Sequence, residues 1–451
     1  MTQFLFFTDY LLLPFYLLFV IFLMNFYFQR KHGNNSKLKK HFNLALYLKL
    51  FGSISISMIY QYYYRGAFDG IHYFEGAKML TSYWFNYPDQ FFTVLFQDLK
   101  TFNLTNKAGL SGSSVHIFAN ESFMVSKVAA IFNLVSFNSF LPCAIFFCIT
   151  AFIGLWNFFI FMIQEFQIPI KTAAYCSLYI PSVLVWGSGI FKDTITFTAL
   201  LWLFICGYYV FIKKKNIIKN AIGIGICIII IYFIKLYIIA AFTPFFIIFV
   251  INSNKNQIKN DLVRILSTPF ILMFGAASMV LFLQNADELF GRYSVDQVLE
   301  TASQTAYYIK ENNAGSAYNL EVDFSSPTGI LIAIPQAVNI TLFRPYPWEY
   351  LNPFILFASI ESMYFLYYTI YLFYKIGFFK TFGVIYKSPI AQFGLLFSLT
   401  FAFMVGISSA NFGSLVRYKI PIMPFYLLFL AVLYKEKIFK GIKPKRRKLI
   451  A

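Results

Sequence analysis

One short segment of the sequence places two carboxylates and a histidine directly after a run of tyrosines. The segment reads FDGIHYFEGAKML and carries Asp69, His72 and Glu75. A carboxylate at a membrane surface can take a proton from a sugar hydroxyl, or bind a metal ion that orients phosphate. Asp69 is therefore a candidate catalytic base, and His72 and Glu75 are candidate substrate ligands. The alternative is that Asp69 caps a helix that begins near Ile71, because aspartate is a favoured cap residue.

A second segment, IPSVLVWGSGIFKDTITF, combines a tight glycine turn with the start of a helix. Gly187 and Gly189 precede Lys192 and Asp193, which fall in the expected first turn of that helix. A helix N-terminus with a glycine-rich backbone and a lysine suits an anion such as the phosphate of a lipid carrier. Lys192 and Asp193 are therefore candidate substrate-binding residues. The alternative is a plain hairpin in which Asp193 caps the helix and Lys192 pairs with it.

Three further basic residues stand in short distinctive contexts. Lys235 interrupts the apolar run YFIKLYIIAAF, Arg344 lies in TLFRPYPWEY, and Arg417 lies in NFGSLVRYKIPIMPF. An ionisable residue inside an apolar run is a functional candidate, although a lysine at a turn can also extend to the membrane surface. The guanidinium of arginine binds phosphate or pyrophosphate through two parallel hydrogen bonds. The alternatives are a head-group anchor for Arg417 and an ion pair with Glu349 for Arg344.

Several well-known chemistries leave no trace in the sequence. It contains no Walker loop, dinucleotide fingerprint, zinc motif or nucleophile elbow. The five cysteines all fall inside apolar runs without metal-ligand spacing. No cofactor is therefore evident, and a divalent metal is possible without being implied. Glu361 lies inside an apolar run, so we expect it to be buried with a partner, for which the outer basic residues are candidates.

The elements that carry these residues are expected to be membrane-spanning helices. The chain has 451 residues, of which 59% are hydrophobic and 12% charged, and apolar runs long enough to cross a bilayer recur from end to end. We predict an all-α polytopic membrane protein with a single integral domain over residues 1–451. The eleven predicted spans are 5–28, 43–60, 139–162, 173–190, 194–212, 217–233, 237–252, 265–284, 353–374, 389–408 and 417–434.

The charges are distributed unevenly along the chain. The net charge of +18 comes from short basic segments between the apolar runs, which are 30–40, 213–219, 255–264, 375–387 and 435–448. This is the pattern of cytoplasmic loops, so the excess charge needs no nucleic-acid partner. It predicts an outer N-terminus and an inner, basic C-terminal tail at 435–451. The high content of Phe, Ile, Lys and Asn is typical of a low-GC bacterial genome, so we expect the membrane to be the cytoplasmic membrane of a bacterium.

Two long outer segments, 61–138 and 285–352, then hold 13 of the 19 acidic residues. Each contains an apolar stretch that is too short to span, 127–137 in the first and 328–343, broken by Pro335, in the second. We expect these stretches to form helices in the outer membrane interface.

The three segments resemble parts of the membrane-embedded class C glycosyltransferases and the related oligosaccharide and O-antigen polymerases of bacteria. FDGIHYFEGAKML is similar to their first outer-loop segment, PSVLVWGSGIFKD to a proline-to-acidic hairpin midway, and NFGSLVRYKIPIMPF to a late arginine-then-proline segment. The resemblance implies that Asp69 acts in catalysis and that Arg417 is the late arginine. In that family the acidic loop normally follows the first span, whereas here it follows the second, which an additional N-terminal span would explain.

These observations predict an enzyme that transfers sugar or oligosaccharide from a polyprenyl-phosphate-linked donor outside the cytoplasm, in cell-surface glycan assembly. The lipid-linked donor, a glycan or lipid-linked acceptor and membrane lipid are the expected partners. Arg417, Lys192 and Lys235 would meet the phosphate, and Asp69 would deprotonate the acceptor. The sugar, the acceptor and the choice between single transfer and polymerisation stay open. The alternatives are a transporter or flippase of lipid-linked saccharides, and a structural subunit of an envelope assembly.

Overall fold

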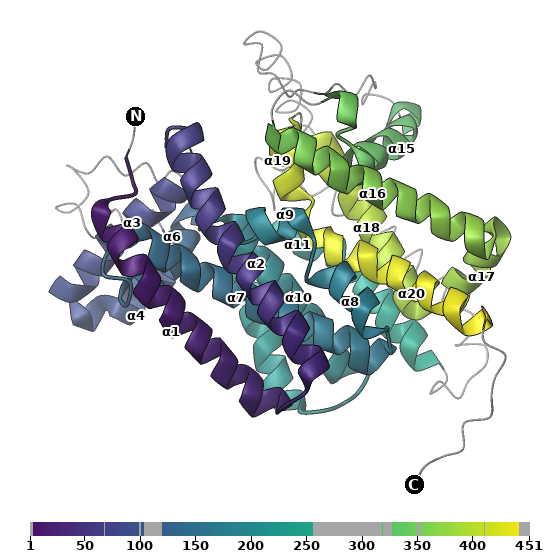
Figure 1. The fold of residues 1–451 in the computed structure, drawn as a ribbon, viewed down its shortest axis with the longest axis horizontal. Helices are drawn as coiled ribbons and strands as arrows, with labels where there is room; N and C mark the ends of the chain where they lie inside the picture. Colours follow the sequence, from purple (N-terminus) through teal and green to yellow (C-terminus); the bar gives the residue numbers. More distant parts are fainter. Residues whose placement is uncertain are drawn as a thin grey trace. The chain divides into compact units, whose positions relative to one another are not determined.

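A computed structural model describes residues 3–66, 68–98, 101–102, 120–255, 318, 327–349, 353–409 and 411–441. Helices account for every element in these ranges, and they follow the chain from α1 to α20 in Figure 1. Eight helical stretches of the described residues are long and apolar enough to cross a membrane. The prediction of an all-helical, multi-span membrane protein is therefore confirmed.

The long helices agree closely with most of the predicted spans. They are α1 (Phe7–His32), α2 (Ser36–Met58), α7 (Phe140–Phe166), α10 (Lys192–Phe211), α11 (Ile217–Asn254), α16 (Pro353–Ile376), α18 (Pro389–Ser408) and α20 (Met423–Gly441). A π-helical turn, Ile59–Tyr63, extends α2. Seven shorter helices enter the account below: α3 (Asp69–Asn86), α4 (Phe91–Phe96), α6 (Asn120–Asn133), α8 (Ile170–Ser177), α9 (Pro181–Trp186), α15 (Pro327–Phe343) and α17 (Phe378–Lys387). The predicted span 265–284 lies outside the described residues.

The predicted span at 173–190 is wrong as a single helix. The chain instead forms α8 and α9, separated by residues 178–180. Pro181 is the first residue of α9, a position that proline tolerates. Proline also disfavours helical backbone in the residue before it, which keeps the two helices apart.

Helix α11 reverses direction at Lys235, where φ is −151° and ψ is 73°, outside the helical region. A straight helix over this range would place Asn254 roughly 55 Å from Ile217. However, the side-chain amide of Asn254 donates to the carbonyl of Phe211 at 3.0 Å, and Phe211 precedes Ile217 by only a short turn. The chain must therefore fold back at Lys235, which agrees with the predicted pair of spans at 217–233 and 237–252.

The chain divides into two compact units, each described by itself. Unit 1 contains residues 1–158, 183–203 and 222–236, and unit 2 contains 159–182, 204–221 and 237–451. The organisation into a single integral domain stays a prediction.

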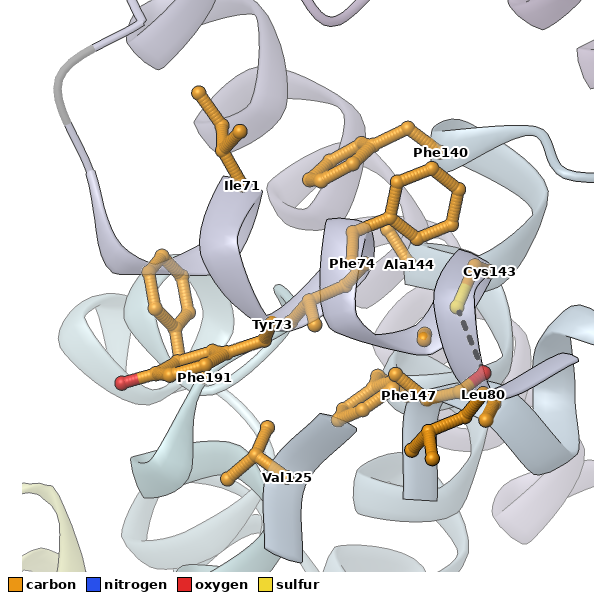
Figure 2. Packing of buried hydrophobic residues seen from close by; sticks show 14 of the residues in the cluster. Ile71, Tyr73, Phe74, Leu80, Val125, Phe140, Cys143, Ala144, Phe147 and Phe191 are labelled. Atoms are coloured by element: carbon orange, nitrogen blue, oxygen red, sulfur yellow. Dashed lines mark hydrogen bonds between the residues drawn. The ribbon is translucent and has the colours of Figure 1, made fainter. Parts of the chain in front are cut away.

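The core of unit 1 lies where α3 packs on α6 and on the start of α7. Ile71, Tyr73 and Phe74 of α3 are buried together with Phe140 of α7 and with Phe191, which precedes α10 (Figure 2). The first outer segment thus contains helices, as expected. Residues 127–133 of its apolar stretch belong to α6, which begins at Asn120, ends at Asn133 and buries one face against α3, whereas residues 134–137 form a turn after the helix.

In unit 2, α15 packs along α18 without a break at Pro335, contrary to the prediction for 328–343. The hydroxyl of Thr341 donates to the carbonyl of Ala402 at 2.7 Å. One turn away, a Cβ on Gly406 would lie 2.4 Å from the carbonyl oxygen of Ala337. Only glycine permits this backbone approach, and the two contacts show that the helices run antiparallel.

The helix ends that carry lysines gather at one end of unit 2. Lys435 donates to the carbonyl of Phe166 at 2.9 Å, and Lys437 donates to the hydroxyl of Tyr371 at 2.7 Å. Lys213 pairs with Glu165 at 2.9 Å. The C-terminal ends of α7, α10, α16 and α20 therefore lie together, which we call the lysine-rich end of unit 2. That the basic segments share one side of the membrane stays a prediction.

Candidate functional site

Asp69 is the first residue of α3 and is exposed. The cap position is occupied by Phe68, which makes no side-chain cap hydrogen bond. Asp69 is therefore not the cap that the alternative interpretation required. Its carboxylate still lies in the first helical turn, where the partial positive charge of the backbone N–H groups favours an anion. Asp69 therefore presents an exposed carboxylate at the start of a helix.

The start of α10 meets the same face of α3. Tyr73 follows Asp69 by four residues, so both lie on one side of the helix. The ammonium of Lys192 lies 6.0 Å from the centroid of the Tyr73 ring, at the limit of a cation–π contact. Phe191 packs into the same buried cluster as Tyr73 (Figure 2). Thus two segments that are more than a hundred residues apart in sequence come together within unit 1. His72 and Glu75, also on α3, are half-buried, and their roles as substrate ligands stay predictions.

Asp193 and Lys235 form a buried ion pair next to this contact. Their side chains are 1% and 8% exposed, and the ammonium of Lys235 bonds directly to the carboxylate of Asp193. Lys235 is therefore buried. The alternative interpretation, in which Lys235 extends to the membrane surface, is wrong. The pair ties the reversal of α11 to the first turn of α10. The first turn of α10 also carries Lys192, the cation that lies by Tyr73.

Lys49 is a buried charge that the sequence analysis missed. It lies in the middle of α2, is fully buried, and donates to the carbonyls of Val183 and Gly187, each at 2.7 Å. A Cβ on Gly187 would lie 2.7 Å from the carbonyl oxygen of Val183 and 3.3 Å from the Lys49 ammonium. Lys49 therefore fixes the turn that leads into Lys192. The signal was present in the sequence, as a single lysine inside a predicted span.

Asp9 is a second buried charge that was missed. One of its carboxylate oxygens accepts from the hydroxyl of Ser139 at 2.8 Å and from the backbone N–H of Leu141 at 3.0 Å. The other oxygen accepts from the N–H of Phe6 at 2.9 Å. Asp9 thus joins the starts of α1 and α7, and these bonds account for it as a structural residue.

Lys127 on α6 holds the end of α4. Its ammonium donates to the carbonyl of Leu95 at 3.0 Å and also to that of Gln97. Burial lowers the pKa of Lys127 to about 8, against the opposing effect of the Asp98 carboxylate. Lys127 therefore joins α6 to the end of α4 through an ammonium whose pKa lies below the usual lysine value.

In unit 2, Glu361 is buried and fully engaged. Its carboxylate accepts from the N–H of Ser182 at 2.6 Å and from the hydroxyl of the same residue at 2.7 Å. Lys419, which is also buried, interacts electrostatically with Glu361 and donates to the hydroxyl of Ser362 at 2.9 Å. That hydroxyl in turn donates to the carbonyl of Arg344 at 3.0 Å. The expectation that Glu361 is buried with a basic partner is confirmed.

The two candidate arginines both belong to unit 2. Arg344 and Glu349 form a forked ion pair, with Nε lying 3.1 Å from one carboxylate oxygen and a second guanidinium nitrogen bonded to the other. This confirms the ion-pair alternative for Arg344. Arg417 is half-buried in the last turn of α19 (Phe412–Tyr418), two residues before Lys419. Its binding of phosphate stays a prediction.

The predicted site residues therefore fall into two groups. Unit 1 holds Asp69, His72, Glu75, Lys192, Asp193 and Lys235, whereas unit 2 holds Arg344 and Arg417. Among the described residues, no three histidine, cysteine or acidic side chains are grouped in a way that could hold a metal ion.

Comparison with protein-family models, with curated proteins and with solved structures finds no match.

Proposed function

We propose that the chain is an integral membrane glycosyltransferase that uses a polyprenyl-phosphate-linked donor on the outer face of a bacterial cytoplasmic membrane. One observation carries the proposal. The helix that begins with Asp69 packs beside Lys192 and the Asp193–Lys235 pair, so an exposed carboxylate and a cation share one end of unit 1. A base for the acceptor and a positive charge for the leaving group are the two requirements of this reaction.

In the proposed reaction, the carboxylate of Asp69 takes the proton of an acceptor hydroxyl while that oxygen attacks the anomeric carbon of the donor sugar. The bond between that carbon and the carrier phosphate breaks, and the electron pair leaves with the phosphate. Lys192 stabilises the negative charge on the phosphate. Lys235 acts through Asp193 and holds the first turn of α10 in place. The phosphate contacts of Arg417 and Arg344, which belong to unit 2, stay predictions, and Glu349 already engages Arg344.

A transporter of lipid-linked saccharides is the second candidate, because ionisable residues are buried within the candidate spans. Lys49 lies in the middle of α2, and Glu361 and Lys419 are buried in unit 2. Transport pathways place such residues near the middle of the membrane. Transfer and transport differ in chemistry, because only transfer releases free polyprenyl phosphate.

The test uses purified parent protein in liposomes with a polyprenyl-linked saccharide extracted from the source membrane. Mass spectrometry follows the release of polyprenyl phosphate, and a membrane-impermeant reagent follows movement of the saccharide across the bilayer. We expect release of polyprenyl phosphate, lowered about 10²- to 10⁴-fold in Asp69→Asn, because the amide cannot act as a base. The matched control is Asp89→Asn, which removes another exposed carboxylate of the same outer segment. This variant should release polyprenyl phosphate at the rate of the parent protein. Movement of intact donor without release would contradict the proposal and support the transporter.

A further inference from the structure

Helix α17 joins two candidate membrane spans and therefore lies at a membrane surface. Helix α16 ends at Ile376, α17 covers Phe378–Lys387, and α18 begins at Pro389. Gly377 makes the turn into α17 with φ of +91°, a conformation that side chains strongly disfavour. The N–H of Gly377 donates to the carbonyl of Phe373, and its own carbonyl accepts from Thr381, each at 2.9 Å. The chain is therefore built to turn directly from a span into a surface helix.

One side of α17 packs on unit 2. Thr381 and Val384 are buried, and α17 contacts α16, α18 and α20. The rest of the surface of α17 is exposed, and aromatic residues and lysines occupy different sides of it. At about 100° per residue, Phe378, Phe379, Phe382 and Tyr386 fall within an arc of roughly 100°. The exposed fractions of these four aromatic side chains are 59%, 88%, 50% and 78%.

The lysines lie on a third side of the helix. Lys380 and Lys387 are exposed and point about 80° or more beyond the edge of the aromatic arc. Lys375 and Lys437 lie nearby, at the ends of α16 and α20 that form the lysine-rich end. Residues 362–435 contain no aspartate or glutamate. The acidic residues of α16 and α20 are Glu361, which is buried and accepts from Ser182, and Glu436, which lies between Lys435 and Lys437 in sequence. Lysines therefore outnumber acidic side chains at this end.

We propose that α17 is an interfacial helix that binds anionic phospholipids of the bilayer in which the protein is embedded. Its aromatic arc would enter the acyl-chain boundary, where amphipathic helices bury their apolar face. Lys380 and Lys387 would bind the phosphates of the lipid head groups. The positive charge of these two lysines selects anionic over zwitterionic lipid. This inference does not depend on the proposed function.

The first test measures the depth of the two arcs. The variants Phe379→Cys and Lys387→Cys of the full chain each receive a spin label and are reconstituted in nanodiscs. The parent protein, treated with the same label, is the control, because its five cysteines are buried. Accessibility to oxygen, which concentrates in lipid, is compared with accessibility to a water-soluble nickel chelate. We expect oxygen to dominate at position 379 and the chelate to dominate at position 387. Equal chelate accessibility at the two positions would overturn the proposal.

The second test measures lipid preference. Native mass spectrometry compares the phosphatidylglycerol and phosphatidylcholine retained by the parent and by the double variant Lys380→Gln, Lys387→Gln. Each lysine at an anionic surface is worth about 1 kcal/mol, so loss of both should lower the preference for phosphatidylglycerol roughly 30-fold. The matched control, Lys214→Gln with Lys215→Gln, removes two exposed charges from another connection and should keep most of the preference. If the double variant of α17 keeps the parent's preference for phosphatidylglycerol, the proposal is likewise wrong.

Discussion

The buried pair between Lys235 and Asp193 allows one strong prediction, which concerns the stability of single and double variants. Replacing Lys235 by methionine removes the cation and leaves the carboxylate of Asp193, whose side chain is 1% exposed, without its partner. Asp193→Leu does the reverse and leaves a buried ammonium at the reversal of α11. Uncompensated charges in such surroundings are costly, because neither water nor a counter-charge stabilises them.

The magnitude follows from the burial of both groups. Each single variant should lower the free energy of unfolding by about 3–5 kcal/mol, the usual cost of breaking a buried pair by removing one partner. The double variant Asp193→Leu, Lys235→Met leaves no charge behind, and apolar replacements of buried pairs are often neutral or stabilising. We therefore expect the double variant to be more stable than the sum of the single effects predicts, by at least about 3 kcal/mol.

The assay is equilibrium unfolding in mixed micelles with increasing SDS, followed by circular dichroism. The control is Glu165→Gln, which breaks the Lys213–Glu165 pair, where the lysine side chain is 47% exposed. Because its lysine is about half exposed, this pair should contribute at most about 1 kcal/mol. Additive single effects, or a Lys235→Met variant as stable as the parent, would refute the reasoning. The double variant also tests function. If the pair only positions α10, the folded double variant should retain part of its transferase activity, whereas a direct phosphate contact by Lys235 predicts complete loss.

Three further predictions concern other parts of the chain. Arg417→Lys should weaken donor use by more than tenfold, as about 2–5 kcal/mol of a forked charged contact is lost, while Lys440→Ala should have little effect in the same assay. A silent Arg417→Lys would indicate a head-group anchor. Because the pKa of Lys127 is lowered to about 8 in the folded protein, the unfolded chain binds more protons between about pH 8 and the usual lysine value near 10.4. The unfolding temperature of the parent should therefore rise with pH across this window relative to Lys127→Met, and a parallel course of the two would contradict the assignment. Finally, a reporter active only outside the cytoplasm should work when fused near residues 113 or 313 and fail near 214 or 445, whereas activity at 214 would reverse the orientation.

Features set by local sequence were largely predictable. The break at Lys235 was expected because a lysine interrupts a run of apolar residues that is too long for one span, and the chain does reverse there. The ion pair between Arg344 and Glu349 was the alternative to phosphate binding by Arg344. It could be foreseen because the two residues are five positions apart, with prolines fixing the backbone between them. The partner of Asp193 was not identified, because Lys235 lies forty-two positions further along the chain. The sequence suggested Lys192, the cation nearest to Asp193 along the chain, as the partner of that carboxylate.

Burial of single charges inside apolar helices was harder to interpret. Asp9 and Lys49 each stand alone in a run of apolar residues. Apart from the N–H of Phe6, which bonds to Asp9, their partners lie 130 or more positions away. A sequence shows that such a residue needs a partner without showing which backbone groups supply it. The same holds for α15, where Pro335 suggested a break. The helix continues through it because α15 packs along α18, and tertiary contacts can outweigh the local cost of a proline.

The broken segment at 170–186 explains two of the buried charges together. Helix α9 is too short to satisfy its own terminal N–H and C=O groups, and in a membrane these groups cannot turn to water. Glu361 accepts from the N–H of Ser182 at the start of α9, and Lys49 donates to the carbonyls of Val183 and Gly187 at its end. An anion at the N-terminus and a cation at the C-terminus also match the helix dipole. Lys49 and Glu361 therefore have a complete structural explanation, and they need not form part of a transport pathway. Because these residues were the main support for transport, the carboxylate and cation at the starts of α3 and α10 leave transfer as the better proposal.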